Sequence, residues 1–230
     1  MKSPRQAPAP RVAEALEEAA AFGTFFTIER GGPDKGWHPV EEAYTAGCAD
    51  LIAATCDRYG TREQRVGASV MQLGHAARLW SPVLACAVVQ GIVPDLEGLH
   101  RADDGPALRL PASPTGWYVE GVPAMTEALY TVVVTRRLDA LAAGLRVRVA
   151  PRLLAGNAAS ALVEAARAVL AARPDRRGIL TAVVEGLLST GRLSGAGKVT
   201  GPDLTFRRRS CCLYYRVPSG EKCEDCSLAG

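Results

Sequence analysis

Apolar positions recur every three or four residues along most of the chain, which is the pattern of amphipathic α-helices. This spacing predicts helices over residues 11–22, 39–60, 125–145, 151–172 and 176–191. The small residues within the apolar stripe of 151–172 allow a neighbouring helix to approach closely. β-branched residues lie in the middle of 125–145, but the length of the segment and its Ala and Leu content favour a helix.

The segment from Thr61 to Gly91 also has a clear helical pattern. Thr61 and Gln64 are spaced as a capping box, and apolar residues then follow at helical intervals as far as Trp80. Because proline lacks a backbone donor and clashes with the preceding turn, we expect Pro82 to bend or end this helix. The remainder is then a second helix closed by Gly91, and one long bent hairpin is an equally good interpretation.

Short apolar segments on both sides of Pro114 and Gly116 predict a small β-hairpin within residues 107–121. Together with the helices, this predicts a mainly α fold of the α+β class. We expect a helical body over residues 1–205 and a cysteine-rich tail over residues 206–230.

Composition limits the class of protein. A chain of 230 residues that is 48% hydrophobic can bury a core without disulfides. The opening residues 1–11 lack the apolar run of a secretory signal, and the longest apolar stretch, residues 81–93, is too short to span a bilayer. We therefore expect a soluble, cytoplasmic protein without stable membrane insertion. The net charge of +3 gives no indication of nucleic-acid binding.

The tail holds four of the seven cysteines, arranged as an adjacent pair, ten residues and a CxxC pair: Cys211, Cys212, Cys223 and Cys226. In a reducing cytosol, such a group indicates metal or redox chemistry rather than disulfides. The sequence VPSG at residues 217–220 is turn-forming and can fold the first pair back onto the second.

Four thiolates that meet at one point indicate zinc or an iron–sulfur centre. Neighbouring side chains diverge on a regular strand, so the adjacent pair favours a centre with two irons. A structural zinc site, which would make the protein a binding module for a chelate or protein partner without redox chemistry, and unligated thiols remain alternatives. We expect the cysteines outside the tail, Cys48, Cys56 and Cys86, to be structural, since buried cysteine behaves as a small hydrophobe.

The stretch "FRRRSCCLYYRVPSGEKCEDCSL", residues 206–228, resembles the C-terminal signature of the FhuF-type ferric siderophore reductases. Residues 67–96 and 152–170 are similar to two internal helical blocks of that family. One departure is Ala155, where the family has a bulkier residue. The resemblance implies a 2Fe-2S cluster ligated by Cys211, Cys212, Cys223 and Cys226, and a helical body that binds the ferric siderophore.

A ferric-siderophore reductase would deliver one electron to chelated Fe(III), because Fe(II) is held far more weakly by the same oxygen donors. The sequence has no GxGxxG motif between a strand and a helix, so we expect no nicotinamide or flavin site. The electron should therefore come from a separate donor such as a ferredoxin or a flavin reductase.

A tail of about twenty-five residues has too little apolar surface to form a pocket alone, so we expect the chelate to dock between the tail and the helical blocks. The candidate substrate residues are His75, Arg78, Trp80, Asn157, Arg207, Arg208, Arg209 and Arg216. The arginines could instead raise the cluster potential, or form only a solvated basic face. Core packing, helix-surface positions and local hydrogen bonds are the alternatives for the other four.

Overall fold

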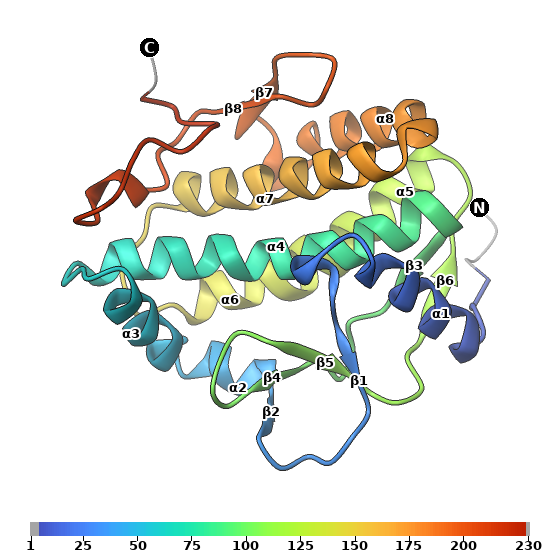
Figure 1. Cartoon of the computed structure of the whole chain (residues 1–230), viewed down its shortest axis with the longest axis horizontal. Coiled ribbons are helices and arrows are strands. Elements are labelled where there is room, and N and C mark those ends of the chain that lie inside the picture. The colour runs from blue at the N-terminus through green and yellow to red at the C-terminus, as the bar shows by residue number, and fades with distance from the viewer. Residues whose placement is uncertain (1–4, 229–230) are drawn as a thin grey trace.

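Two long helices, α4 (Gln64–Gln90) and α7 (Pro151–Ala172), pack along each other at the centre of the molecule (Figure 1). The computed structural model describes residues 5–228. Both helices bury apolar residues on most of their faces, so each needs a partner on several sides. The other helices are α1 (Ala9–Ala20), α2 (Val40–Thr45), α3 (Ala49–Arg58), α5 (Val122–Leu129), α6 (Asp139–Gly144) and α8 (Arg177–Leu188). The predicted mainly α fold with minor β structure is confirmed.

Helix α4 runs through Pro82 without a break, so the predicted division into two helices is wrong. Every residue from Ser81 to Val88 is buried, and packing on all sides holds the chain helical despite the missing backbone donor. The helix ends at Gly91, whose φ of 66° is left-handed, as predicted. The predicted capping box is also wrong, because Thr61 Oγ1 accepts from Glu63 N–H at 3.2 Å and no side chain of residues 5–228 caps the helix.

The single helix predicted over residues 39–60 is two helices, α2 and α3. Gly47 and Cys48 between them have φ values of 77° and 53°, and this left-handed pair turns the chain. Hydrophobic spacing missed the break, because the residues on both sides of the turn keep a helical pattern. By contrast, the helix predicted over 151–172 is confirmed at both ends, and the helix predicted over 176–191 is confirmed within one to three residues.

The segment 125–145 is helical, as predicted, but its middle is a π-helix, η2 (Tyr130–Leu138), between α5 and α6. Val132, Val133 and Val134 lie in this wider part and are all buried. The remaining short helical turns are η1 (Thr24–Phe26), η3 (Pro174–Arg176), η4 (Gly191–Leu193) and η5 (Tyr214–Arg216).

The predicted hairpin at residues 107–121 is wrong, although both of its segments are strands. Strand β5 (Leu108–Leu110) lies in a four-stranded sheet of order β1-β5-β4-β2, whereas β6 (Gly116–Tyr118) pairs with β3 (Ile92–Pro94) in a separate sheet. Apolar residues mark where a strand is buried but do not name its partner. The other members of the larger sheet are β1 (Glu29–Arg30), β2 (Trp37–Pro39) and β4 (His100–Ala102).

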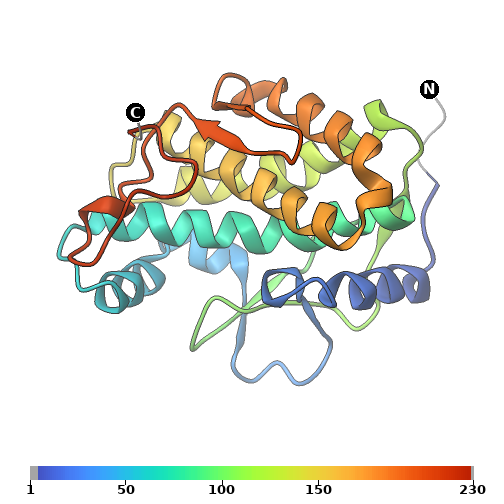
Figure 2. The same cartoon turned by 45° about the horizontal axis from the view of Figure 1, so that its top comes forward.

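The tail enters through a third sheet, in which β8 (Phe206–Arg208) pairs antiparallel with β7 (Gly197–Val199). It then lies against α7 and reaches the first turns of α4 (Figures 1 and 2). The predicted boundary at 205/206 falls in this β7–β8 hairpin. Helix α7 is long and apolar enough to cross a membrane, but 72% of its most apolar window is buried inside the protein, so here it is the core helix of a folded body.

Candidate metal centre

A reverse turn in the tail brings the second cysteine pair back to the first. The peptide N–H groups of Val217 and Gly220 bond to the carbonyls of Tyr214 and Val217, at 3.1 and 2.8 Å. A Cβ at Gly220 would collide with the Tyr214 carbonyl oxygen, so only glycine allows this close turn. The predicted VPSG turn therefore forms, and it places Cys223 Sγ 3.6 Å from Cys212 Sγ.

Backbone donors point at the other two thiols. Leu213 N–H lies 3.3 Å from Cys211 Sγ, and Leu228 N–H lies 3.4 Å from Cys226 Sγ. Leu213 adopts a left-handed φ of 69°, which turns the chain directly after the adjacent cysteines. Cys212 and Cys226 are almost fully buried, while Cys211 and Cys223 are half-buried. Each thiol thus has a backbone donor or another thiol beside it.

One pair of tail thiols has the spacing of two ligands on one metal. With metal–sulfur bonds of about 2.3 Å, two thiolates on one tetrahedral metal lie roughly 3.7 Å apart, close to the Cys212–Cys223 separation. Within residues 5–228, no group of three or more His, Cys, Asp or Glu side chains surrounds a single metal position. The four tail thiols are a donor set that fits a binuclear iron–sulfur cluster.

The hydrogen bond between Cys212 and Cys223 polarises this pair. This contact lowers the pKa of Cys212 and raises the pKa of Cys223. Burial raises the pKa of Cys211, and the positive charge of Arg208 opposes that rise. A cation beside the adjacent cysteines favours their thiolate forms, which are the forms that bind metal.

A buried polar network joins the tail to both central helices. Ser69 Oγ on α4 donates to the Cys212 carbonyl at 2.6 Å, and Asn157 Nδ2 on α7 donates to Ser69 O and Oγ at 2.9 and 3.1 Å. Arg208 Nη2 donates in turn to Asn157 Oδ1. Ser69 and Asn157 are fully buried, so the tail is held by groups inside the body rather than on its surface.

A second set of contacts fixes the tail along α7. Ser160 Oγ donates to the buried carboxylate of Asp225, and Ser210 Oγ donates to the Arg152 carbonyl at 2.9 Å. Gly156 lies between these points, and a Cβ there would overlap Ser210 Oγ. Sequence reasoning missed Ser69, Ser160, Gly156 and Asp225. A glycine next to a polar residue within the apolar stripe of 151–172 is the signal that was available.

The four arginines near the cysteines have different surroundings, although all were predicted as one group. Arg207 and Arg209 are exposed, as a steering or solvated face requires. Arg208 is only 2% exposed, so it does not belong to that face. Arg216 forms a two-pronged ion pair with Glu63 at the start of α4, with N–O distances of 2.8 to 3.1 Å.

The other substrate candidates separate in the same way. Asn157 lies in the network beside the tail, but Trp80 is fully buried, eleven residues beyond Ser69 on α4 and therefore about 16 Å farther along the axis. His75 is buried and bonds Tyr44 Oη at 2.7 Å, and burial lowers its pKa to about 3. Arg78 bonds the Gly74 carbonyl and stacks on Phe25. These contacts favour packing roles for the three residues; their predicted substrate role stays a prediction.

The cysteines outside the tail lie in the body. Cys48 and Cys86 are buried, and burial raises the pKa of Cys48 to about 11. Cys56 is half-buried beside Gly67. These surroundings agree with the structural role predicted for them.

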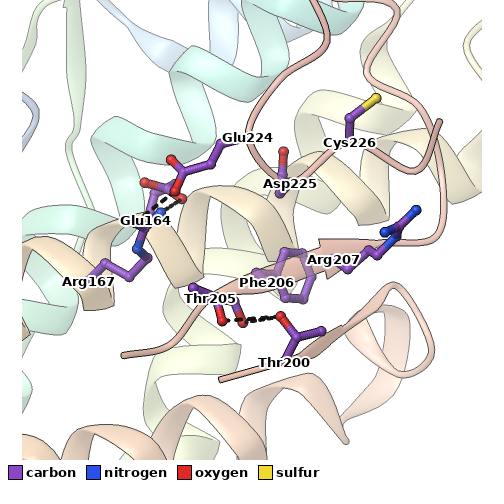
Figure 3. A pocket seen from close by; sticks show the side chains of 9 residues that line it. All are labelled: Glu164, Arg167, Thr200, Thr205, Phe206, Arg207, Glu224, Asp225 and Cys226. Carbon is purple, nitrogen blue, oxygen red and sulfur yellow. Dashed lines mark hydrogen bonds and ion pairs between the residues drawn. The ribbon is translucent and has the colours of Figure 1, made fainter. Parts of the chain in front are cut away.

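A polar cavity of about 190 Å³ opens beside Cys226, between α7, the β7–β8 hairpin and the tail (Figure 3). On one side, Arg167 binds Glu164 and Glu224, each at 2.9 Å. Cys226 and Arg207 lie on the other side (Figure 3). This cavity gives solvent and solutes an approach to one of the four tail cysteines.

Comparison with known proteins identifies the tail. Residues 208–228 match the family model of the FhuF 2Fe-2S C-terminal domain, and the match includes all four tail cysteines. No curated protein and no solved structure matches the chain. The tail is therefore similar to the C-terminal domain of the FhuF type, and its cofactor is a 2Fe-2S cluster.

Proposed function

We propose that this protein is a cytosolic ferric-siderophore reductase that gives one electron to chelated Fe(III) and so releases Fe(II). The observation that carries this proposal is the match of the tail, with its four thiols, to the FhuF 2Fe-2S domain. A 2Fe-2S cluster supplies a one-electron carrier whose potential depends on hydrogen bonds, charge and exposure. Fe(III) in oxygen chelates needs one electron to become the weakly held Fe(II).

The cavity beside Cys226 supports our proposal of where the chelate enters. Its volume of about 190 Å³ accommodates part of a chelate rather than a whole siderophore, so the rest of the ligand would lie on the adjoining surface. Arg207 lines this cavity and is exposed, as is Arg209 two residues on. We propose that these two arginines attract anionic ferric chelates, while a separate donor such as a ferredoxin or flavin reductase supplies the electron.

Stopped-flow reoxidation of the reduced cluster tests the proposal. The protein is reduced anaerobically and mixed with ferric chelates of different charge, and the recovery of visible absorbance is followed. We expect reoxidation by ferric siderophores with formation of Fe(II), which a ferrous-specific dye detects. If no ferric siderophore in a broad set reoxidises the cluster faster than ferric citrate does, the siderophore-reductase function is wrong.

A paired arginine variant tests the docking surface separately. Arg207→Gln with Arg209→Gln should slow the reaction with anionic chelates at low salt and leave it nearly unchanged at high salt, because exposed charges are screened beyond about 8 to 10 Å. The control is Arg11→Gln with Arg30→Gln, which removes two exposed arginines from α1 and β1, elements that lie away from the tail. Equal rates for both double variants at low salt would exclude steering by Arg207 and Arg209.

A further inference from the structure

Arg208 is a buried cation with unused hydrogen-bond donors. It lies on β8, three residues before Cys211, and is 2% exposed. Its Nη2 donates to Asn157 Oδ1, but its Nε and Nη1 have no hydrogen-bond partner among residues 5–228. The Asn157 oxygen is neutral, and the guanidinium forms no direct ion pair within residues 5–228. The nearby buried carboxylate of Asp225, whose backbone carbonyl accepts from Arg208 N–H at 3.1 Å, accepts instead from Ser160 Oγ.

A buried guanidinium without a compensating anion is strongly unfavourable, and so are buried N–H groups without acceptors. The arginine is nevertheless fixed in place, because Asn157 is itself held by two hydrogen bonds to Ser69. Ser69 also binds the carbonyl of Cys212. One chain of hydrogen bonds thus sets the position of the cation and of a cluster ligand together.

An anionic cluster next to Arg208 would supply the missing compensation. Arg208 lies three residues before Cys211, and the chain of hydrogen bonds from its guanidinium through Asn157 and Ser69 ends on the Cys212 carbonyl. A 2Fe-2S centre with four thiolate ligands is negative when oxidised, and one electron from an external reductant adds another negative charge without breaking a bond. A fixed cation therefore stabilises the reduced form more than the oxidised form, which raises the reduction potential.

We propose that Arg208 is a positioning and redox-tuning residue of the cluster, held in place by Asn157 and Ser69, and that its buried charge keeps the cluster reducible. This inference rests on the cluster alone and holds whatever the electron acceptor is. It separates Arg208 from Arg207 and Arg209, which carry the same charge on the solvent side of the same segment.

A midpoint-potential titration with dithionite and redox mediators tests this inference, with the holoprotein compared against Arg208→Gln, Arg208→Lys and the control Arg207→Gln. We expect Arg208→Gln to shift the reduction equilibrium at least about tenfold toward the oxidised form, which is about 59 mV for a one-electron couple. The shift should be the same at low and high salt, because a buried charge is little screened. Arg207→Gln should give a smaller shift that high salt removes.

Arg208→Lys keeps the charge, so its midpoint potential should lie closer to that of the parent protein than to that of Arg208→Gln. If Arg208→Gln is loaded with cluster and its midpoint equals that of Arg207→Gln, the proposal is overturned. If Arg208→Gln cannot hold the cluster but Arg208→Lys can, the need for the charge supports the proposal. Loss of the cluster from both Arg208 variants overturns it, because Arg208 would then serve only to pack the tail.

Discussion

Gly156→Ala should loosen the tail while leaving the helical body intact. A Cβ at this position would overlap Ser210 Oγ and lie 3.1 Å from Arg208 Nη2. Ser210 can avoid the overlap only by turning away from the Arg152 carbonyl, which it bonds at 2.9 Å. The lost hydrogen bond costs about 1 kcal/mol, and the remaining crowding costs about 1 to 3 kcal/mol.

The same substitution should stabilise the helix in which it lies. Alanine is favoured over glycine inside a helix by about 1 kcal/mol, so α7 itself gains stability. The two effects act on different transitions. Adding the hydrogen-bond cost to the lower value for crowding reduces the free energy of tail detachment by about 2 kcal/mol. The free energy of unfolding of the body is not reduced.

Cluster loss to an iron chelator and hydrogen exchange of residues 206–226 measure detachment of the tail, and urea unfolding followed by circular dichroism measures the body. If the tail must open before the cluster is lost, about 2 kcal/mol raises the rate of loss roughly 30-fold. Gly178→Ala on α8 is the matched control, because a Cβ there meets no atom within 4 Å. It should leave the rate of cluster loss unchanged.

A second substitution tests the cause. Ser210→Ala removes the overlapping oxygen, and the Ser210 Cβ lies 3.5 Å from the added Cβ, which is ordinary contact. In the Ser210→Ala background, Gly156→Ala should therefore raise the rate of cluster loss much less. The reasoning is refuted if Gly156→Ala loses its cluster at the rate of the parent protein, or if Ser210→Ala gives no relief.

Two further predictions concern the cysteines and the buried histidine. Serine at any one tail cysteine should abolish the normal cluster spectrum without loss of helical circular dichroism, whereas alanine at Cys86 should keep that spectrum; an unchanged spectrum in a tail variant would refute its role as a ligand. Burial lowers the pKa of His75 from 6.5 to about 3. The unfolded chain therefore binds a proton that the folded protein excludes, so urea stability should be complete above pH 6.5 and fall as the pH drops toward 3, by about 2 kcal/mol at pH 5. His75→Gln, which can still bond Tyr44, should show a shallower fall, and an equal slope in both proteins would contradict this explanation.

The tail arginines show what the sequence could and could not reveal. Arg207, Arg208 and Arg209 look like one basic run, but they lie on and directly after strand β8, where alternate side chains point to opposite sides. Phe206 and Arg208 are buried, and Arg207 and Arg209 are exposed. The alternation would have been predictable if these residues had been recognised as a strand. The hydrogen-bond partners of Arg208 were not predictable, because they come from distant parts of the chain.

The same limit explains which elements were predicted well. The apolar stripe of α7 is a local property, and its bounds agree with those predicted. Strand β5 pairs with β4 just before it and with the distant β1, and β6 pairs with β3, so the predicted β5–β6 hairpin was wrong. At the metal centre, spacing was sufficient to place Cys223 beside Cys212, because the VPSG turn is local. The support from Ser69 and Asn157 comes from other helices and was visible only in the fold.

The contact between Ser69 and Cys212 joins residues that are 143 positions apart, and this distance sets the order in which the protein can assemble. Helices α4 and α7 precede the tail in the chain, so they can pack before the ligand cysteines have been synthesised. Contacts of such large separation form late and slowly. The packed helices can therefore form the surface that binds the tail before the tail folds. Cluster insertion would then be the last step of maturation. An apoprotein with a folded helical body should be a normal intermediate before that step.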